Sequence, residues 1–230
     1  MEIRLLYFEG CPGFKRAENI LRDVVNSMGV EVDIDLVDVN KGEVEKIKNF
    51  LGSPTILING DDIEGKRTDE PVMSCRLYGF KPYPERYLIE AAVLRALNPK
   101  KILFMCVHNS ARSILAEAIA RHLAPSGVEI LSAGSNPSGV KEEAIAVLKE
   151  LSIPIEGLYS KSVNDIDARG VNAVITLCAE EVCPVFLGKA IRLHWGLNDP
   201  SLVVDKNERI EAFRRTRDEL IKRLQFLFMR

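Results

Sequence analysis

The chain has 230 residues, of which 47% are hydrophobic and 28% are charged, and its formal net charge is −2. This length predicts two domains rather than one. The nearly neutral charge creates no sequence-wide field toward nucleic acid or an anionic membrane, so we expect neither as a partner.

The first half of the chain predicts a small α/β domain. Its expected strands are residues 2–8, 30–39 and 55–59, and its expected helices are residues 15–28, 43–51 and 85–97. These assignments rest on apolar side chains that recur at helical spacing or alternate with polar ones. Asn98-Pro99-Lys100 breaks the last helix. We therefore expect a boundary there, between domains 1–98 and 99–230.

Cys11 lies between the first expected strand and the first expected helix, whose N-terminus favours a thiolate. Pro54 precedes the third strand and is a candidate for a cis peptide bond. This order resembles a thioredoxin-like fold, which implies a redox role for Cys11. Phe14 stands where a dithiol oxidoreductase of that fold has its second cysteine. Cys11 therefore acts either alone or with Cys75, for which a packing role is an equal alternative.

The second half begins with the segment Cys106–Ser113, Cys-Val-His-Asn-Ser-Ala-Arg-Ser, between an expected strand at 102–105 and an amphipathic helix. A strand, a tight polar loop and a helix start form a cradle of backbone N–H groups for a tetrahedral oxyanion. Cys106 opens the cradle as a candidate thiolate nucleophile, and the planar guanidinium of Arg112 closes it. The candidate oxyanion-binding residues are His108, Asn109, Ser110, Ala111, Arg112 and Ser113. A buried cysteine that precedes an arginine by chance is the alternative, which the surrounding strand and helix disfavour.

Two further cysteines follow another expected strand, residues 171–177. Cys178 ends this strand, where open α/β sheets gather functional residues, and Cys183 lies in the next polar loop. A reductase must give its substrate two electrons, which two thiols supply as they form a disulfide; a phosphatase needs no second thiol. Core cysteines and a zinc half-site are the alternatives. Because only His194 is near this pair in sequence, we expect no metal, and we expect no cofactor.

Asp199-Pro200 has two interpretations. A carboxylic acid on a loop that faces the anion can protonate a departing oxygen. Asp-Pro is also a common start of a turn, and the dipeptide alone favours that interpretation.

Together these motifs resemble the low-molecular-weight tyrosine phosphatase fold and, within it, the thiol-dependent arsenate reductases. The resemblance runs from about Lys101 to the C-terminus and implies a parallel sheet flanked by helices. The motifs that carry it are Cys106 to Ser113, Ala116-Glu117-Ala118, Ser132-Ala133-Gly134, Thr176-Leu177-Cys178, Cys183-Pro184, His194-Trp195-Gly196 and Asp199-Pro200.

The resemblance also implies a mechanism. Cys106 attacks arsenate while the loop and Arg112 hold its oxygens, and Asp199 protonates the leaving hydroxyl. Cys178 then attacks Cys106 and arsenite departs. Cys183 attacks Cys178 next, so the oxidation is stored as a Cys178–Cys183 disulfide until a thioredoxin-type or other thiol donor reduces it. Fusion to the first domain suggests that Cys11 passes those electrons.

Supporting roles follow from the same resemblance: Ser113 hydrogen-bonds the Cys106 sulfur, and Asn109 holds the loop because Asn tolerates left-handed backbone. Two departures are Ala111, where some relatives have another cysteine, and a Cys178-to-Cys183 spacing shorter than in some reductases.

Two alternatives to a reductase remain. A low-molecular-weight protein tyrosine phosphatase needs neither Cys178 nor Cys183, but Ser201 stands where such phosphatases usually have an aromatic residue. A thiol-based sensor or metalloid-binding module would use Cys11 and Cys75 without turnover.

The cysteines also predict a compartment. Glu2 and Arg4 interrupt any signal-peptide pattern, and the longest apolar stretches are strand-sized. Five cysteines without an export signal predict reduced thiols in the cytoplasm, used for chemistry.

Overall fold

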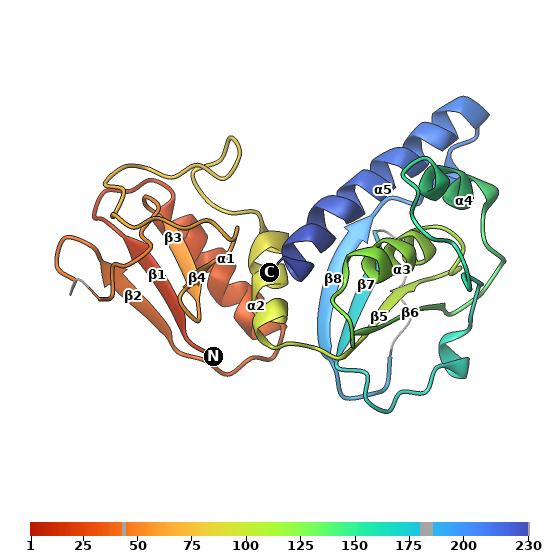
Figure 1. Ribbon diagram of the computed structural model, residues 1–230, viewed down its shortest axis with the longest axis horizontal. Coiled ribbons are helices and arrows are strands. Elements are labelled where there is room, and N and C mark those ends of the chain that lie inside the picture. The colour runs from red at the N-terminus through yellow and green to blue at the C-terminus, as the bar shows by residue number, and fades with distance from the viewer. Residues whose placement is uncertain (43–44, 180–185, 230) are drawn as a thin grey trace. The chain divides into compact units, whose positions relative to one another are not determined.

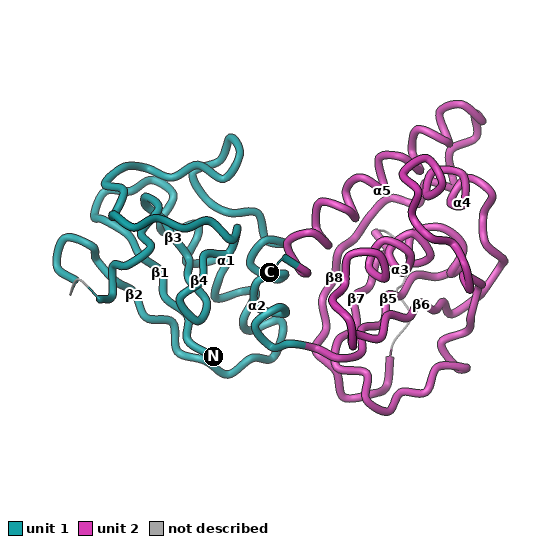
Figure 2. Tube along the Cα trace, in the orientation of Figure 1, with its two compact units in different colours: residues 1–98, 229–230 teal, residues 99–228 magenta. Residues whose placement is uncertain are grey.

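The computed structural model describes residues 1–42, 45–179 and 186–229 (Figure 1). Unit 1 comprises Met1–Asn98 with Met229, and unit 2 comprises Pro99–Phe228 (Figure 2). Each unit has its own four-stranded sheet. Within the described ranges, none of the helices combines the length and the apolar character that crossing a membrane requires.

Unit 1 is built on a mixed sheet with the strand order β2-β1-β3-β4. Its elements are β1 (Ile3–Tyr7), α1 (Phe14–Ser27), β2 (Ile34–Asp38), β3 (Thr55–Ile58), β4 (Asp61–Asp62) and α2 (Arg86–Ala96). The crossover through α1 makes β1 and β2 parallel, whereas β1 with β3 and β3 with β4 are antiparallel. The expected strands at 2–8 and 55–59 and the first and last expected helices are confirmed, and the expected strand at 30–39 is confirmed over Ile34–Asp38. The Ser53–Pro54 peptide bond is cis.

The expected helix at 43–51 is wrong in its described part, because residues 45–49 form turns. Asn49 has a left-handed φ of 61°, which a continuous helix does not tolerate. Its side-chain oxygen accepts the Thr68 N–H at 3.0 Å, and its amide donates to the Lys66 carbonyl at 3.4 Å. These bonds hold the turn in place while Phe50 packs into the core with Leu6, Val37, Val39 and Leu57.

Unit 2 contains the expected parallel sheet, with the order β6-β5-β7-β8 and only parallel pairings among its strands as described. Its elements are β5 (Lys101–Cys106), α3 (Arg112–Leu123), β6 (Glu129–Gly134), α4 (Glu142–Lys149), η1 (Val163–Asp165), β7 (Ala173–Cys178), β8 (Ile191–Leu197), η2 (Pro200–Leu202) and α5 (Lys206–Phe228). Helix α5 packs against both α3 and α4.

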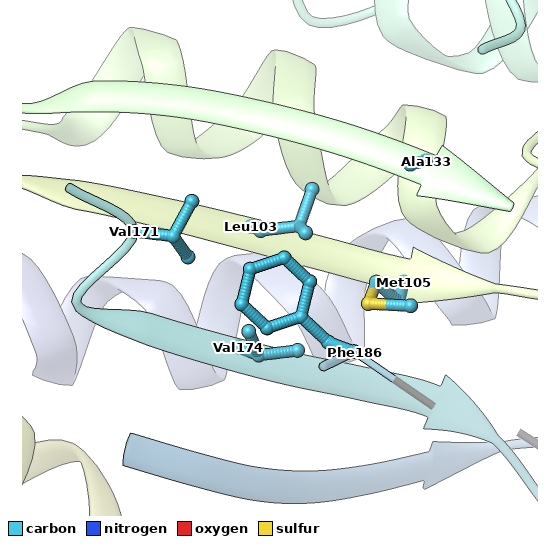
Figure 3. Packing of buried hydrophobic residues seen from close by; sticks show 6 residues of the cluster. All are labelled: Leu103, Met105, Ala133, Val171, Val174 and Phe186. Carbon is cyan, nitrogen blue, oxygen red and sulfur yellow. The ribbon is translucent and has the colours of Figure 1, made fainter. Parts of the chain in front are cut away.

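The two faces of this sheet have different partners. Leu103 and Met105 of β5 share one face with Val174, and Phe186 packs over them (Figure 3). Cys106 follows Met105 and so faces the other way, toward α3. The nucleophile candidate therefore lies at the carboxyl end of a central strand, beside a helix start.

Candidate active site

Cys106 is the last residue of β5 and is 2% exposed. Its Sγ lies 2.9 Å from the Oγ of Ser113, the second residue of α3. A thiolate can only accept a hydrogen bond, so in that state Ser113 donates to the sulfur. The position expected for Ser113 is confirmed.

The backbone N–H groups of the loop between Cys106 and α3 point away from the segments that bind the carbonyls of this loop. Four of its carbonyls accept hydrogen bonds from backbone N–H groups outside the loop. They are those of Val107, His108, Ser110 and Ala111, which accept from Asn136, Ser138, Lys141 and Leu115 at 2.9, 3.1, 3.0 and 2.9 Å. In a trans peptide the following N–H points to the opposite side of the chain. The N–H groups of His108, Asn109, Ala111 and Arg112 therefore turn away from those partners. Successive N–H groups at a helix start are suited to binding an oxyanion.

Asn109 holds this loop from behind. Its φ is 41°, the left-handed conformation expected for it. Its amide donates to Ser113 Oγ and Ser132 Oγ, both at 2.8 Å, and its Oδ1 accepts the Lys161 N–H at 2.6 Å. Gly134 permits the close approach of β6, since a Cβ there would lie 2.8 Å from the Asn109 nitrogen.

A buried carboxylate, that of Glu117, supports Asn109 through Ser132. The sequence patterns assign no role to Glu117. Ser132 Oγ donates to the carboxylate of Glu117, which is fully buried. Lys161 Nζ lies 3.0 Å from that carboxylate, and Arg121 also pairs with it. A buried carboxylate needs such partners. The available signal was Glu117 itself, within the motif Ala116-Glu117-Ala118.

Arg112 and Asp199 lie together at the other side of the loop. The Arg112 side chain is 1% exposed, and its Nη2 lies 2.8 Å from Asp199 Oδ2. Its Nη1 donates to the Leu197 carbonyl at 3.0 Å, at the end of β8. Asp199 Oδ1 accepts the Ser201 N–H at 2.9 Å and thereby caps η2. The carboxylate therefore forms the turn with one oxygen and faces the arginine with the other.

Cys178 ends β7, next to β5, and is fully buried. Leu103 pairs with Val174, and Met105 pairs with Thr176. The pairing of β7 with β8 shifts register between Thr176 and Cys178. The two thiols thus lie at the carboxyl ends of two neighbouring parallel strands.

The remaining predicted residues are dispersed. The half-buried His108 has its ring Nδ1 3.1 Å from the Asn136 carbonyl oxygen, and Ser110 is buried. Cys183 lies outside the described residues. Cys11 belongs to unit 1, half-buried in the turn before α1. Across the described ranges, no cluster of three or more His, Cys, Asp or Glu side chains is suited to a metal ion.

Comparison with known proteins gives three findings. Residues 101–230 match the family model for low molecular weight phosphotyrosine protein phosphatase. An arsenate reductase of Halalkalibacterium halodurans is 35% identical over 132 residues, which cover 56% of this chain and 95% of that protein. Arsenate reductase 1 of Bacillus cereus is 35% identical over 130 residues, which cover 56% of this chain and 93% of that protein. A solved structure of an arsenate reductase in the phosphate binding state is 32% identical, covering 56% of this chain and 96% of that one, with a TM-score of 0.48.

Proposed function

Because the chain belongs to the low-molecular-weight phosphotyrosine protein phosphatase family, and two arsenate reductases are 35% identical to it over nearly their whole length, we propose that it is a thiol-based arsenate reductase. The substrate is arsenate, a tetrahedral oxyanion, and the product is arsenite. The observation that carries the proposal is the Cys106 sulfur, 2.9 Å from Ser113, at the start of a loop that Arg112 closes.

In the first step the Cys106 thiolate attacks arsenic, and a sulfur–arsenic bond replaces one arsenic–oxygen bond. The loop N–H groups and the Arg112 guanidinium hold the remaining oxygens. Asp199, 2.8 Å from Arg112, gives a proton to the departing oxygen, which leaves as water when that oxygen already carries one proton.

The second step transfers the electrons. The Cys178 thiolate attacks the Cys106 sulfur, a disulfide forms, and the sulfur–arsenic bond breaks with its electron pair left on arsenic as arsenite. Cys183 then attacks Cys178 and releases Cys106 as a thiolate.

A phosphatase is the second candidate, which the description of the family model favours. Cys106, Arg112 and Asp199 suffice for attack on a phosphate ester and protonation of its leaving group. That reaction gives no role to Cys178.

One pair of assays distinguishes the reductase from the phosphatase. A single preparation is assayed with arsenate for arsenite release and thiol loss, and with an aryl phosphate for hydrolysis. The reductase proposal predicts arsenite with a matching loss of thiols. Rapid ester hydrolysis without arsenite would reverse the ranking.

We further propose that residues 1–98 form a thioredoxin-like domain and residues 99–230 the reductase domain. The strand–helix–strand unit of β1, α1 and β2, followed by antiparallel β3 and β4 and by α2, supports the first assignment. Cys11 at the start of α1 is then the thiol that reduces the Cys178–Cys183 disulfide. Tethering raises its effective concentration to about the millimolar range.

The role of Cys11 is tested with a limiting external thiol donor, by comparing steady-state reduction in the intact chain and in Cys11→Ser. Equal rates would remove Cys11 from the electron path.

A thiol relay also requires reduced cysteines, so we propose that the enzyme works in the cytoplasm.

A further inference from the structure

The segment that contains Cys75 is bound to the Ser53-Pro54 turn by backbone hydrogen bonds. Ser53 and Cys75 form an isolated parallel β-bridge. The Ser53 N–H donates to the Ser74 carbonyl at 2.8 Å, and the Arg76 N–H donates to the Ser53 carbonyl at 2.9 Å. Cys75 is therefore held between two bonds to one residue, although its side chain is exposed.

Gly52 makes this approach possible. A Cβ at Gly52 would lie 2.8 Å from the Ser74 carbonyl oxygen, and its φ of +101° is one that other residues rarely adopt. The turn is therefore shaped to accept the 74–76 segment closely.

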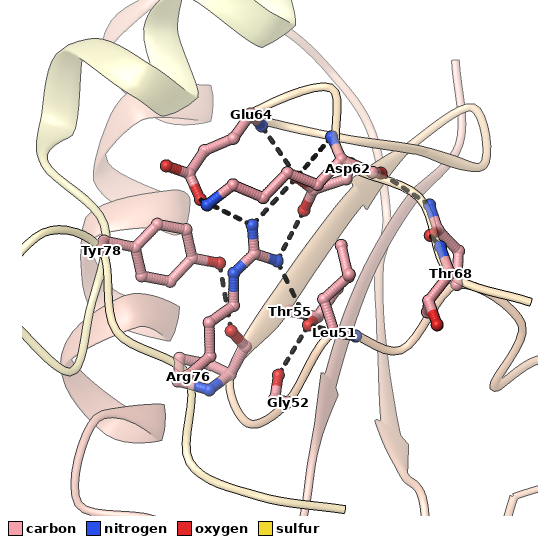
Figure 4. A network of polar contacts seen from close by, with 11 residues as sticks. Leu51, Gly52, Thr55, Asp62, Glu64, Thr68, Arg76 and Tyr78 are labelled. Carbon is pink, nitrogen blue, oxygen red and sulfur yellow. Dashed lines mark hydrogen bonds and ion pairs between the residues drawn. The ribbon is translucent and has the colours of Figure 1, made fainter. Parts of the chain in front are cut away.

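The side chain next to Cys75 anchors the segment in the interior (Figure 4). Arg76 has a 4% exposed side chain, and its guanidinium donates to both oxygens of Asp62, at 2.6 and 2.9 Å, and to Glu64 at 2.8 Å. Burial lowers the pKa of Arg76, but the hydrogen bonds that its guanidinium donates to Asp62 and Glu64, together with the nearby negative charge, outweigh burial, and its pKa is raised. The anchor thus stays charged, and removing either partner would leave a buried charge.

Tyr78 closes the same cluster. Its ring lies 4.4 Å from the Arg76 guanidinium carbon, and its hydroxyl donates to the Pro54 carbonyl at 3.0 Å. Burial raises the pKa of Tyr78, so the phenol keeps its proton and this hydrogen bond at neutral pH. The residues on both sides of Cys75 therefore tie it to the Ser53-Pro54 turn.

The backbone around Cys11 is also connected by hydrogen bonds to the Ser53-Pro54 turn. The Phe8 N–H donates to Ser53 Oγ at 3.3 Å, and the Cys11 N–H donates to the Phe8 carbonyl at 3.3 Å. Both neighbours of Cys75 are bonded to Ser53, and Cys11 is connected to Ser53 through Phe8. These connections bring the two cysteines of unit 1 to a common turn.

We propose that Cys75 is the resolving thiol of Cys11, and this inference rests on the proposed electron transfer through Cys11. The Cys11 thiolate attacks the Cys178–Cys183 disulfide, which breaks as a mixed disulfide forms at Cys11 and one thiolate leaves. The Cys75 thiolate then attacks the Cys11 sulfur, and the second reductase thiolate leaves. Two electrons have moved, the reductase dithiol is restored, and unit 1 holds a Cys11–Cys75 disulfide for an external thiol to reduce.

The test uses the full chain with Cys106, Cys178 and Cys183 all replaced by serine, so that only Cys11 and Cys75 remain. The protein is treated with glutathione disulfide and then freed of small molecules. The mass of the intact monomer and its peptide map follow the adduct. We expect glutathione to leave Cys11 without added thiol and a Cys11–Cys75 cross-linked peptide to appear. In Cys75→Ser, glutathione should remain on Cys11.

The matched control moves the thiol by one residue, combining Cys75→Ser with Ser74→Cys, so that the thiol content is unchanged. We expect the adduct to persist in this variant because alternation turns the new side chain away. Persistence of glutathione on Cys11 when Cys75 is present would overturn the proposal, as would equal resolution in the control. Arsenate takes no part in this experiment, so failure of arsenate reduction is a separate outcome.

Discussion

Nη2 of Arg112 lies 2.8 Å from Oδ2 of Asp199, and their side chains are only 1% and 9% exposed. The pair joins the residue that closes the anion loop to the residue that starts η2. A substrate oxygen held by Arg112 is therefore within reach of a carboxyl group. Asp199 Oδ1 has a separate task as acceptor for the Ser201 N–H.

This division of tasks makes Asp199→Asn an informative variant. The amide oxygen can still accept the Ser201 N–H, so the turn and the thermal unfolding temperature should be retained. The amide cannot donate a carboxylic proton, so the single-turnover rate with arsenate should fall by ~10²–10⁴-fold. An unchanged rate would leave Asp199 with only its role in the turn.

The Ser113 hydroxyl should support the reactivity of Cys106. A hydrogen bond to a charged group contributes about 1.5–3 kcal/mol, so Ser113→Ala should slow alkylation of Cys106 by iodoacetamide at neutral pH by roughly tenfold or more. Peptide mass spectrometry isolates this cysteine from the others. Ser160→Ala is the control, because its hydroxyl bonds the His108 carbonyl at 3.2 Å and not the sulfur. Similar rates in both variants would contradict the role of Ser113.

Glu117 should be a determinant of stability in unit 2. Glu117→Ala leaves Lys161, only 7% exposed, without its carboxylate, and breaking a buried pair costs about 3–5 kcal/mol. Urea unfolding is followed by the fluorescence of Trp195, the only tryptophan, which is buried in β8. The exposed Glu156→Ala is the control. A loss below 1 kcal/mol, relative to that control, would show that the network is unimportant for stability.

The anion loop was predictable because its signals are local. Between Ile102 and Leu123 the sequence predicts an apolar strand, then a polar loop, then an amphipathic helix. Parallel pairing of β5 with β7 then places Cys106 and Cys178 at the carboxyl ends of neighbouring strands. Asn109 was predictable for the same reason, since its residue type permits the left-handed backbone that it adopts.

Other features depend on contacts distant in sequence. Periodicity predicts a helix at residues 43–51, but it cannot detect the hydrogen bonds between Asn49 and residues 66 and 68, which hold residues 45–49 as turns. The pairing of Arg76 with Asp62 and the bridge between Cys75 and Ser53 likewise require the folded sheet. Sequence patterns therefore predict the anion loop and its candidate nucleophile, but not the supports that depend on contacts distant in sequence.

The ion pairs of Glu150, at the end of α4, with Arg214 and Arg217 of α5 should make the stability of the protein depend on pH. Hydrogen bonds from Arg214 and Arg217 lower the Glu150 pKa to about 2, from an ordinary value of 4.5. A carboxylate with a lowered pKa stabilises the fold above its unfolded value, and this contribution disappears as the pH falls through the folded value.

Glu150→Gln should therefore be less stable than the parent chain at pH 7, and the difference should shrink between pH 4.5 and about 2. Urea midpoints, again from Trp195 fluorescence, measure it at each pH. Glu156→Gln serves as the exposed control. A difference that does not change over this range would mean that the ion pairs of Glu150 do not determine it.

The most direct measurement of the thiol relay is the amount of arsenite released per protein molecule, with excess arsenate and an excess thiol donor, in the parent chain and two variants. The parent chain should release arsenite over many turnovers. Cys106→Ser should release none, because only Cys106 lies in the anion loop, and Cys178→Ser should stop at a covalent arsenic adduct on Cys106. Sustained arsenite release by Cys178→Ser would contradict the relay.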